Sequence, residues 1–412
     1  MSWMFRLLCL WSVWMVCGSG CGVLFTEEPR RETVLDGPID GLSHAQLQTF
    51  KVGDEEFARV FTPATGLGPI FVEASCLACH TADGKGHPST NLTRFGVGDP
   101  TDAARFDYLL HLGGPQLQHR AILGYQAEKL PNLEGLARSV RSAPTVTGLG
   151  LIEAIPESEI LRYADPEDKD GDGIRGRPNY VTPPSFFEPV IEHTPKDGKI
   201  MGRFGRKAAA INLLQQVAEA YLNDMGITSD FLMKDLHNPL VGGPSGDTAP
   251  DPEVSAATVR SVTFYMQTLR PPSRRSAEDP VVKQGEGFFA QVGCAKCHVP
   301  SMKTGKSAIE ALREKTVYLY SDLLLHDMGP KLADGYPEGQ ATGNMWRTTP
   351  LWGLGVIGNL MGGQPFYLHD GRAKTLKEAI DYHGGEAQKS RDGFFALSSA
   401  EQEALLVFLR SL

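Results

Sequence analysis

The stretch CLACH at residues 76–80 has a counterpart of the same pattern, CAKCH, at residues 294–298. In both stretches two residues separate a pair of cysteines, and a histidine follows the second cysteine directly. This C-x-x-C-H pattern is typical of c-type haem attachment, in which the sulfurs bond the haem vinyl groups and the histidine binds the iron. The sequence therefore predicts two covalent haems. The residues that would hold them are Cys76, Cys79, His80, Cys294, Cys297 and His298.

A zinc or redox site is the main alternative for paired cysteines. Structural zinc needs four ligands, so the two pairs could together form one four-thiolate site. Two observations favour haem: a histidine follows each pair, and more than half of the chain separates the pairs. The second axial position of each haem iron then decides between electron transfer and the binding of peroxide or oxygen.

The N-terminal segment is typical of an exported protein. Arg6 precedes an apolar run over residues 7–16, and small residues follow up to Cys21. This order predicts a signal peptide at residues 1–21 and a polar tether at residues 22–44. Cys21 after Ser-Gly resembles a lipobox, so either Cys21 carries a lipid or the chain is cleaved nearby. We therefore expect a periplasmic protein, with a membrane-anchored lipoprotein as the open alternative.

The remaining cysteines leave little room for a disulfide. Of the seven cysteines, four belong to the two motifs, Cys9 and Cys17 lie in the predicted signal segment, and Cys21 is the candidate lipid site. No cysteine is left for a structural disulfide, although export would permit one. A redox reaction that relies on a spare thiol therefore has no support in the sequence.

Composition places the chain among ordinary globular proteins. The 412 residues are 41% hydrophobic and carry a net charge of −9. That charge argues against nucleic-acid binding, which favours basic patches. A mildly acidic surface suits a basic electron-carrier partner, although most acidic surfaces only confer solubility.

Hydrophobic periodicity predicts a mainly helical protein with long loops. The expected helices are residues 55–61, residues 207–222, a helix capped by Asp251 with Pro252 at its first position, residues 281–292, and a last helix that opens with the capping box Ser398 and Glu401. Residues 103–111 and 116–129 are expected to be partly helical, residues 33–50 to follow the surface, and residues 140–190 to be mostly loop.

The same order of features occurs twice along the chain. Each half has an entry segment, a C-x-x-C-H motif, long loops and a closing helix, with Pro271 and Pro272 between the halves. This is how a cytochrome c domain is organised. We therefore expect two cytochrome c-like haem domains in tandem, at residues 45–272, with a long insertion, and at residues 273–412.

Further motifs extend the pattern into a family resemblance. They are ADP (164–166), DGDGI (170–174), GRFG (202–205), WRTTPLWGL (346–354), FYLHDGR (366–372), TLKEAI (375–380) and HGGEA (383–387). Their order resembles the bacterial dihaem cytochrome c peroxidases and the related quinone-cofactor maturation enzymes. The closest resemblance is to the di-haem oxidoreductase family of peroxidase-like proteins, and it covers nearly all of the mature chain.

The resemblance implies ligands for the second haem. His383 stands where the peroxidases have a distal methionine and the maturation enzymes a tyrosine, so His298 and His383 are expected on opposite sides of one iron. Imidazole in place of a thioether should lower the reduction potential. Met328 and Met361 are alternative ligands, and His383 could instead be a helix-end residue bonded to solvent or backbone.

The resemblance also implies a reactive first haem. Gln118 and Glu128 share the spacing of a glutamine and a glutamate that line the distal pocket of the peroxidases. A carboxylate there can take a proton from peroxide and return it to the leaving oxygen, while an amide orients it. Both residue types are common at surfaces, and three histidines are alternatives. These are His87, His111 and His119.

Other predicted contacts involve charged side chains. Arg347 and Arg372 are expected to pair with haem propionates, with surface salt bridges as the alternative. Asp168, Asp170 and Asp172 resemble the start of a calcium loop, although Asn179 replaces the carboxylate of its twelfth position. The carbonyls of residues 348–350 offer a second place for calcium, and residues 326–329 are expected to form the wall of the second haem pocket.

Three functions remain open at this stage. The first is a peroxidase-like oxidoreductase that takes electrons from a small electron-carrier protein and reduces hydrogen peroxide. The second is an electron-transfer cytochrome without a catalytic site, and the third is an oxidase that modifies a protein or organic substrate. The relatives place a tryptophan from the first domain between their haems. This mature chain has only Trp346 and Trp352, both in its second half, so the route between the haems stays open.

Overall fold

The computed structural model describes residues 35, 37–236, 238, 241 and 249–412. The predicted signal peptide with Cys21, and most of the predicted tether, lie outside the described residues. Among the helices that are described, none has the length and apolar character needed to cross a bilayer.

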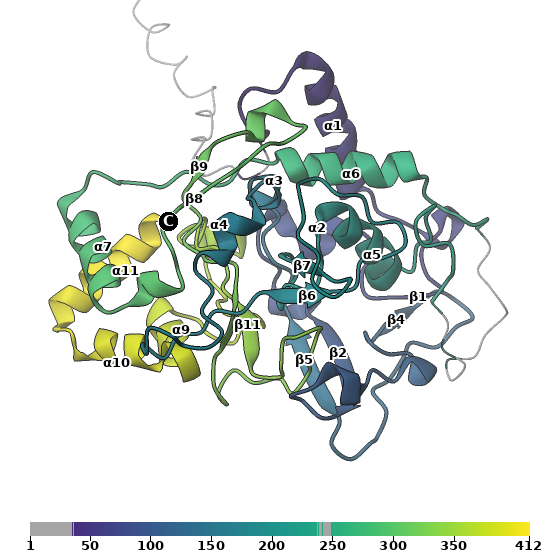
Figure 1. Cartoon of the computed structure of the whole chain (residues 1–412). Helices are drawn as coiled ribbons and strands as arrows, with labels where there is room; N and C mark the ends of the chain where they lie inside the picture. The colour runs from purple at the N-terminus through teal and green to yellow at the C-terminus, as the bar shows by residue number, and fades with distance from the viewer. Residues whose placement is uncertain (1–34, 36, 237, 239–240, 242–248) are drawn as a thin grey trace, which may run out of the picture.

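Helices supply most of the regular structure (Figure 1). Their bounds are α1 (His44–Ala58), α2 (Cys76–Cys79), α3 (Leu149–Glu153), α4 (Glu157–Leu161), α5 (Leu213–Met225), α6 (Ala256–Thr268), α7 (Pro280–Gln291), α8 (Ile357–Leu360), α9 (Leu376–Asp381), α10 (Gln388–Ala396) and α11 (Ser399–Ser411). The prediction of a mainly helical protein with long loops is confirmed.

Short antiparallel sheets, which the sequence did not predict, join the loops. The strands are β1 (Ile70–Phe71) with β4 (Arg120–Ala121), β2 (Leu92–Gly98) between β3 (Phe106–Asp107) and β5 (Ala137–Arg141), β6 (Asn179–Val181) with β7 (Ile200–Gly202), β8 (Met302–Lys303) with β9 (Thr316–Val317), and β10 (Leu325–Asp327) with β11 (Met345–Arg347). The last pair sets His326 opposite Trp346 and Leu325 opposite Arg347. It therefore places three residues of the site described below.

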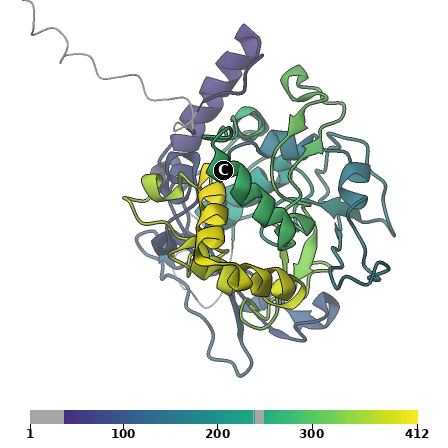
Figure 2. The same ribbon diagram turned by 90° about the vertical axis from the view of Figure 1, so that its left-hand side faces the viewer.

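One helix crossing occurs twice in the structure. In the first half α1 packs on α6, and in the second half α7 packs on α11, where the two helices lie side by side in both views (Figures 1 and 2). A glycine of the first helix meets the backbone of the second at each crossing. A Cβ at Gly53 would lie 2.2 Å from the Ser261 carbonyl oxygen, and a Cβ at Gly285 would lie 2.0 Å from that of Ala404. Only glycine permits so close an approach.

Each crossing also places an aromatic ring against the histidine of a motif. Phe57 follows Gly53 by one helical turn, and its ring lies 5.9 Å from that of His80. Phe289 follows Gly285 in the same way, and its ring lies 6.3 Å from that of His298. The helix pairs thus form a comparable wall behind both motif histidines.

Two hydrophobic clusters surround these crossings. The smaller one joins α7 and α11 through residues such as Phe289, Leu405 and Phe408. The larger one includes α1, α5 and α6 but also Leu319 and Trp352 from the second half. The core of the first half therefore continues past residue 272, and the domain boundary proposed there stays a prediction.

Several element predictions need correction. α1 begins at His44, because Ser43 and Gln46 form a capping box, so residues 44–50 are helical and residues 55–58 are the end of the same helix. α6 is capped by Ser255 and not by Asp251, whose carboxylate accepts a hydrogen bond from the Thr228 hydroxyl at 2.6 Å. Residues 116–129 contain no helix, and residues 103–111 contain only single 3-10 turns.

Other element predictions are confirmed. Ser398 and Glu401 form the expected capping box of α11, whose residues Leu405, Phe408 and Leu409 are buried. α7 covers most of residues 281–292, and α5 covers the second part of residues 207–222.

Candidate functional site

Both C-x-x-C-H motifs fold into one helical turn, followed by a histidine. The first is α2, and the second is a 3-10 turn at Cys294–Lys296. The amide of His80 donates to the Cys76 carbonyl at 2.9 Å, and the amide of His298 donates to the Cys294 carbonyl at 3.0 Å. Residues three apart lie on the same side of such a turn. The spacing therefore presents two sulfurs together, with the imidazole next to them.

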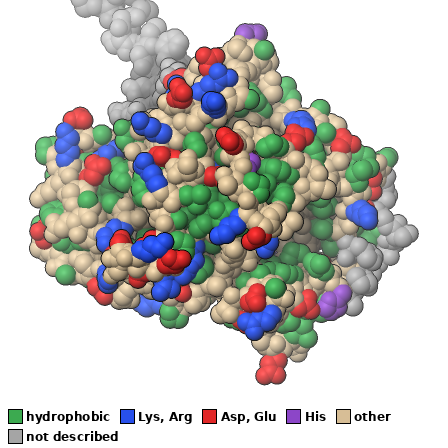
Figure 3. All heavy atoms as spheres, viewed as in Figure 1, with side chains coloured by type: hydrophobic (Ala, Val, Ile, Leu, Met, Phe, Trp, Pro, Cys, Tyr) green, Lys and Arg blue, Asp and Glu red, His purple; other side chains and the backbone are tan. Residues whose placement is uncertain are grey.

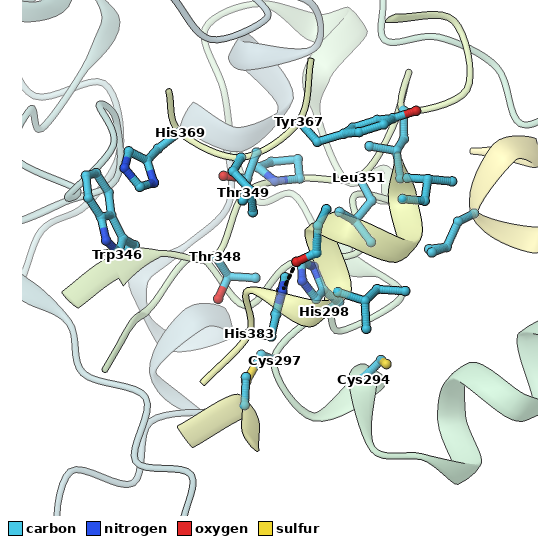
Figure 4. A pocket seen from close by; sticks show the side chains of 18 of the residues that line it. Cys294, Cys297, His298, Trp346, Thr348, Thr349, Leu351, Tyr367, His369 and His383 are labelled. Carbon is cyan, nitrogen blue, oxygen red and sulfur yellow. Dashed lines mark hydrogen bonds between the residues drawn. The ribbon is translucent and has the colours of Figure 1, made fainter. Parts of the chain in front are cut away.

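A large cavity opens beside the second motif (Figure 4). Cys294, Cys297, His298 and His383 line one end of it. Its apolar wall includes Phe289, Leu351, Leu354, Ile380, Leu405 and Leu409. The cavity continues to Gly84 and Lys85, four and five residues after His80 of the first motif. It thus reaches from one motif towards the other.

His298 and His383 are held in the same protonation state. The Nδ1 atom of His298 lies 2.9 Å from the Tyr320 carbonyl oxygen, and that of His383 lies 2.8 Å from the carbonyl of Ala379, the dashed line of Figure 4. Because a carbonyl only accepts, Nδ1 carries the proton in both rings. Burial lowers the pKa of His298 to about 4 and also lowers the pKa of His383.

This is the arrangement of metal-bound histidine, in which one nitrogen donates to the protein and leaves the lone pair of the other for the metal. The hydrogen bond from His383 Nδ1 to the Ala379 carbonyl also matches the alternative of a helix-end residue, because iron ligation and helix capping would both use Nδ1 for this bond. Of the alternative ligands, Met328 lines the cavity and Met361 is not among the lining residues.

The motif cysteines are half-buried, protonated thiols. Burial raises the pKa of Cys76, Cys79 and Cys294 to about 12, and it raises the pKa of Cys297. Among the described residues, no cluster of metal-binding side chains combines the two pairs. A four-thiolate zinc site is therefore not formed, whereas apolar thiols suit bonding to haem.

Three basic side chains line the cavity, and none of them forms an ion pair among the described residues. They are Lys85, Arg206 and Arg347. Lys85 donates to the Phe366 carbonyl, Arg206 to that of Ser142 at 2.7 Å, and Arg347 to that of Gly205 at 3.0 Å.

Burial lowers the pKa of all three, to about 6 for Lys85, about 9 for Arg206 and about 10 for Arg347. Asp370 and Asp322 oppose this lowering only in part, so an anion beside these side chains would favour their charged forms, including that of Lys85. The two propionates of a haem are such anions. An apolar wall, two neutral imidazoles, two thiols and three basic side chains together fit a haem.

Arg372 lies elsewhere. Its guanidinium pairs with Asp370 at 2.7 Å, is half-exposed, and is not among the residues that line the cavity. Its position matches the alternative of a surface salt bridge. Arg347 lines the cavity, and its contact with a propionate stays a prediction.

A charged network lies under Cys297. The two ring nitrogens of His326 lie 2.7 Å from carboxylates of Asp322 and Glu386. Burial by itself would lower the pKa of His326, but Asp322 and Glu386 raise it well above the ordinary value. His326 is thus an imidazolium between two carboxylates. It lines the cavity, as predicted for residues 326–329, but both nitrogens are occupied, which leaves none for an iron.

Gln118 and Glu128 contact each other, and their role in a haem pocket stays a prediction. A Glu128 carboxylate oxygen accepts a hydrogen bond from the Gln118 backbone N–H at 2.7 Å, and the other accepts one from the Asn238 side chain at 2.9 Å. Burial raises the pKa of Glu128 despite these two bonds. The Gln118 side chain donates to the Asn223 carbonyl at 2.8 Å, so it is anchored to the end of α5.

The alternative histidines for this pocket are less suitable. His87, His111 and His119 are all exposed. His80 is buried, and burial lowers its pKa to about 4. Its Nδ1 makes no hydrogen bond among the described residues, although the carbonyls of Pro144 and Gly84 lie nearby.

Trp346 and His369 stack on each other at the cavity wall, with ring centroids 3.7 Å apart and planes inclined by 16° (Figure 4). The Trp346 indole donates to the Leu332 carbonyl at 2.8 Å. Trp352 also lines the cavity. The structure therefore brings both remaining tryptophans to the space between the motifs, although neither belongs to the first half.

The comparison with family models decides the family. The model described as "Di-haem oxidoreductase, putative peroxidase" matches residues 133–412, which is more than half of the chain and includes the second motif. The chain belongs to the di-haem oxidoreductase family. Membership implies two haem cofactors and oxidoreductase activity. The first motif precedes the matched residues.

Solved structures show a distant likeness to this oxidoreductase. Three of them each have a TM-score of 0.38: hydrazine synthase of Kuenenia stuttgartiensis at 14% identity, covering 94% of this chain and 95% of that one; a MauG-like protein associated with microbial copper homeostasis at 14% identity, covering 94% of both; and the diheme peroxidase BthA of Burkholderia thailandensis at 18% identity, covering 89% and 86%. No curated protein matches the chain.

The acidic loop of the oxidoreductase forms a cluster that differs from the predicted one. Carboxylates of Asp165, Asp168 and Asp170 lie within 4.8 Å of one another. Asp172 turns away and pairs with Lys296, between the cysteines of the second motif, at 2.8 Å. The loop therefore touches the second haem site. Thr348 and its neighbours up to Pro350 lie on the cavity wall.

Proposed function

We propose that this chain is an exported, peroxidase-like oxidoreductase with two covalently attached c-type haems in tandem cytochrome c-like domains. Electrons from a small carrier protein enter at the second motif and are used at the first motif, where hydrogen peroxide is reduced. The observation that carries this proposal is the pair of neutral, half-buried imidazoles, His298 and His383, that line one cavity. Two imidazole ligands suit an electron-transfer iron and leave the first motif for the reaction.

A bound haem supplies an iron that stores and exchanges single electrons. The chain supplies the proton chemistry. Glu128 is buried, and burial raises its pKa above that of an ordinary glutamate. As a carboxylate it can take a proton from peroxide, and as an acid it can return that proton to the departing oxygen. The Gln118 backbone N–H and the Asn238 side chain donate to the Glu128 carboxylate and so fix its direction.

Lys85, Arg206 and Arg347 support binding and orientation. Arg206, Arg347 and a Lys85 protonated beside an anion would hold the propionates, while Phe289, the leucines and Ile380 of the wall would exclude water. Exclusion of water strengthens the electrostatic contacts inside the site.

The absorption and electron paramagnetic resonance spectra of the oxidised and half-reduced holoprotein test the proposal. We expect one low-spin iron in both states and one iron that becomes high-spin in the half-reduced protein and responds to peroxide. Two low-spin irons without a response to peroxide would indicate the electron-transfer cytochrome instead. Peroxide turnover that needs an organic substrate and no cytochrome donor would indicate the oxidase.

Export and the lipid anchor stay proposals. We propose that residues 1–21 direct the chain to the periplasm and that Cys21 receives a lipid. Growth with a labelled fatty acid should label the wild type and not Cys21→Ala. A label retained by Cys21→Ala would place the lipid elsewhere.

We also propose a structural calcium ion at the acidic loop, held by Asp165, Asp168 and Asp170. Calorimetric titration of the chelator-treated holoprotein with calcium should show binding that Asp168→Asn weakens. Equal binding by both proteins would exclude this loop.

A further inference from the structure

A shallow cleft on the surface has no lining residue in common with the cavity of the second motif. Its volume is about 400 Å³. Its wall combines three tyrosine rings with charged groups: Tyr108, Tyr180, Tyr336, Arg94, Lys199 and Glu338. The cleft lies among β2, β3, β6 and the loop after β10, on the first half of the chain and at its contact with the second.

A continuous row of side chains connects this cleft with the cavity. It begins at Trp346, which lines the cavity together with the stacked His369. The Arg141 guanidinium lies 5.7 Å from the centre of the Trp346 ring and 5.6 Å from the centre of the Tyr336 ring. The Tyr336 ring lies 5.5 Å from that of Tyr108. Each member of the row therefore contacts the next.

The row is held rigidly and runs from the interior to solvent. Tyr336 is 1% exposed and Trp346 7% exposed, whereas Tyr108 is half-buried at the cleft. Arg141 is fixed by Glu338 at 2.8 Å, and the Tyr108 hydroxyl donates to the Pro337 carbonyl at 3.0 Å. Tyrosine and tryptophan are the side chains from which an electron is most readily removed. Electrons could therefore step from Tyr108 to Tyr336 and then across the Arg141 guanidinium to Trp346.

The charges of the cleft favour an anion. Glu338 is already paired with Arg94 at 2.6 Å and with Arg141. Lys199 is exposed on the cleft wall, and the Lys196 ammonium lies 5.5 Å from the centre of the Tyr180 ring. Lys199 on the cleft wall, Lys196 over the Tyr180 ring and the three tyrosine rings of the lining match a molecule that is both aromatic and acidic.

We propose that this cleft binds small phenolic acids as electron donors and that Tyr108, Tyr336 and Trp346 carry their electrons to the haem cavity. The inference rests on the proposed function. Each phenol gives one electron to the row and its phenolic proton to solvent, and it leaves as an aryloxyl radical. Two such donations, with two protons, reduce one hydrogen peroxide to two waters.

Binding and turnover in the holoprotein test the two parts of this assignment. The probe is 2,5-dihydroxybenzoate, an anionic hydroquinone. Calorimetry should show binding that Lys199→Glu weakens about tenfold, equivalent to 1.4 kcal/mol. Tyr108→Phe and Tyr336→Phe should slow peroxide-dependent oxidation of the probe at least about tenfold and leave oxidation of a reduced cytochrome unchanged. Peroxide should also produce a tyrosine radical signal that Tyr336→Phe lacks.

Tyr318→Phe is the matched control, because Tyr318 is 63% exposed and lies outside both the cleft and the row. If Tyr108→Phe and Tyr336→Phe both oxidise the probe at the wild-type rate, the row does not carry its electrons. If neutral hydroquinone binds as tightly as 2,5-dihydroxybenzoate, and Lys199→Glu weakens neither, the cleft is not an anion site. Loss of the cytochrome reaction in place of the phenol reaction would show that the occupant is a protein.

Failure of the proposed function would be recognised separately. A wild-type holoprotein whose spectrum does not respond to peroxide would refute the peroxidase assignment alone. The row would then be judged by reduction of the oxidised haems with the same probe, which needs no peroxide. Tyr336→Phe should slow that reduction about tenfold, and an unchanged rate would overturn the row.

Discussion

Single residues of the site differ in how far the sequence revealed them. The cysteines and histidines of the motifs follow from spacing alone, and His383 follows from a resemblance. Lys85 and Arg206 were missed as cavity residues, because a lysine between Gly84 and Gly86 has the character of an exposed loop residue. Burial of their charges is a result of packing, which no local pattern encodes. His369 was missed for the same reason, since only its stacking on Trp346 places it at the cavity.

Replacement of His383 by alanine should change the spin state of the second iron. The variant removes the only lone pair that His383 can offer, so a low-spin iron should become high-spin. Magnetic circular dichroism of the oxidised protein measures this. His44→Ala is the control, because His44 is exposed at the start of α1. A low-spin signal identical to the wild type in His383→Ala would exclude His383 as a ligand.

Replacement of Glu128 by glutamine should slow peroxide turnover by about 10²–10⁴-fold, the usual contribution of a positioned acid–base group. The wild type should lose activity as pH falls through the pKa of Glu128, because the carboxylate is the form that accepts a proton. Burial raises that pKa, so the loss should begin at a higher pH than for an exposed glutamate.

Steady-state assays over a range of pH measure both effects. Glu128→Gln should lack the acidic limb of the pH profile. The control is Glu134→Gln, because Glu134 is exposed and lies in the same segment of the chain. If Glu128→Gln still loses activity at low pH, the acidic limb of the profile belongs to another group.

At the scale of elements, the helices with clear caps were predicted best. Ser398 and Glu401 start α11 as expected. Asp251 failed as a cap because Ser255 starts the helix and the Asp251 carboxylate bonds to Thr228 instead. The small sheets were not predicted, since strands of two or three residues such as β8 are too short to show an alternating pattern.

The crossing of α7 and α11 gives a stability prediction. Gly285→Ala places a Cβ 2.0 Å from the Ala404 carbonyl oxygen, so the helices must move apart. The free energy of unfolding should fall by about 1–3 kcal/mol, as measured by urea unfolding of the holoprotein. Gly287→Ala, in the same helix but with no atom within 4 Å, should instead be stabilising by about 0.4–1 kcal/mol. Equal effects of the two substitutions would contradict the close crossing.

At the scale of the whole molecule, the two halves meet at charged and polar groups as well as in the core. Figure 3 shows acidic and basic side chains intermingled on one face of the molecule, so that face has no large patch of a single charge. Inside, Glu386 accepts a hydrogen bond from the Arg175 amide of the first half at 2.9 Å and another from His326 at 2.7 Å. Contacts between segments so distant in sequence were beyond prediction from local patterns.

Replacement of His326 by glutamine should therefore loosen the junction of the halves. It leaves the carboxylates of Asp322 and Glu386 buried without their cation, which should cost about 3–5 kcal/mol at neutral pH. His193→Gln is the comparison, because His193 has a single carboxylate partner, Glu157, at 2.8 Å, and its loss should cost less. Thermal unfolding of the holoproteins measures both.

The pH dependence of this effect has two sides. His326 keeps its proton up to a raised pKa, so its contribution is complete below about 6.5 and is lost as pH rises through that raised pKa. Although burial opposes it, His326 holds the pKa of Glu386 below its ordinary value, so the contribution of Glu386 is lost as pH falls through that lowered pKa. The difference in free energy of unfolding between wild type and His326→Gln should therefore narrow both above the raised pKa of His326 and below the lowered pKa of Glu386. A difference that does not change with pH would contradict the network of His326, Asp322 and Glu386.

The two helix crossings join helices that are separated by stretches of chain of different length. A polypeptide is synthesised from its N-terminus, so α1 can pack only after α6, which ends at Thr268, has been made. α7 waits for the shorter stretch that ends with α11. With haem attached covalently as proposed, each cysteine pair would be open to modification until its crossing forms. The first pair would then have the longer period, because it emerges earlier and its crossing closes the longer stretch.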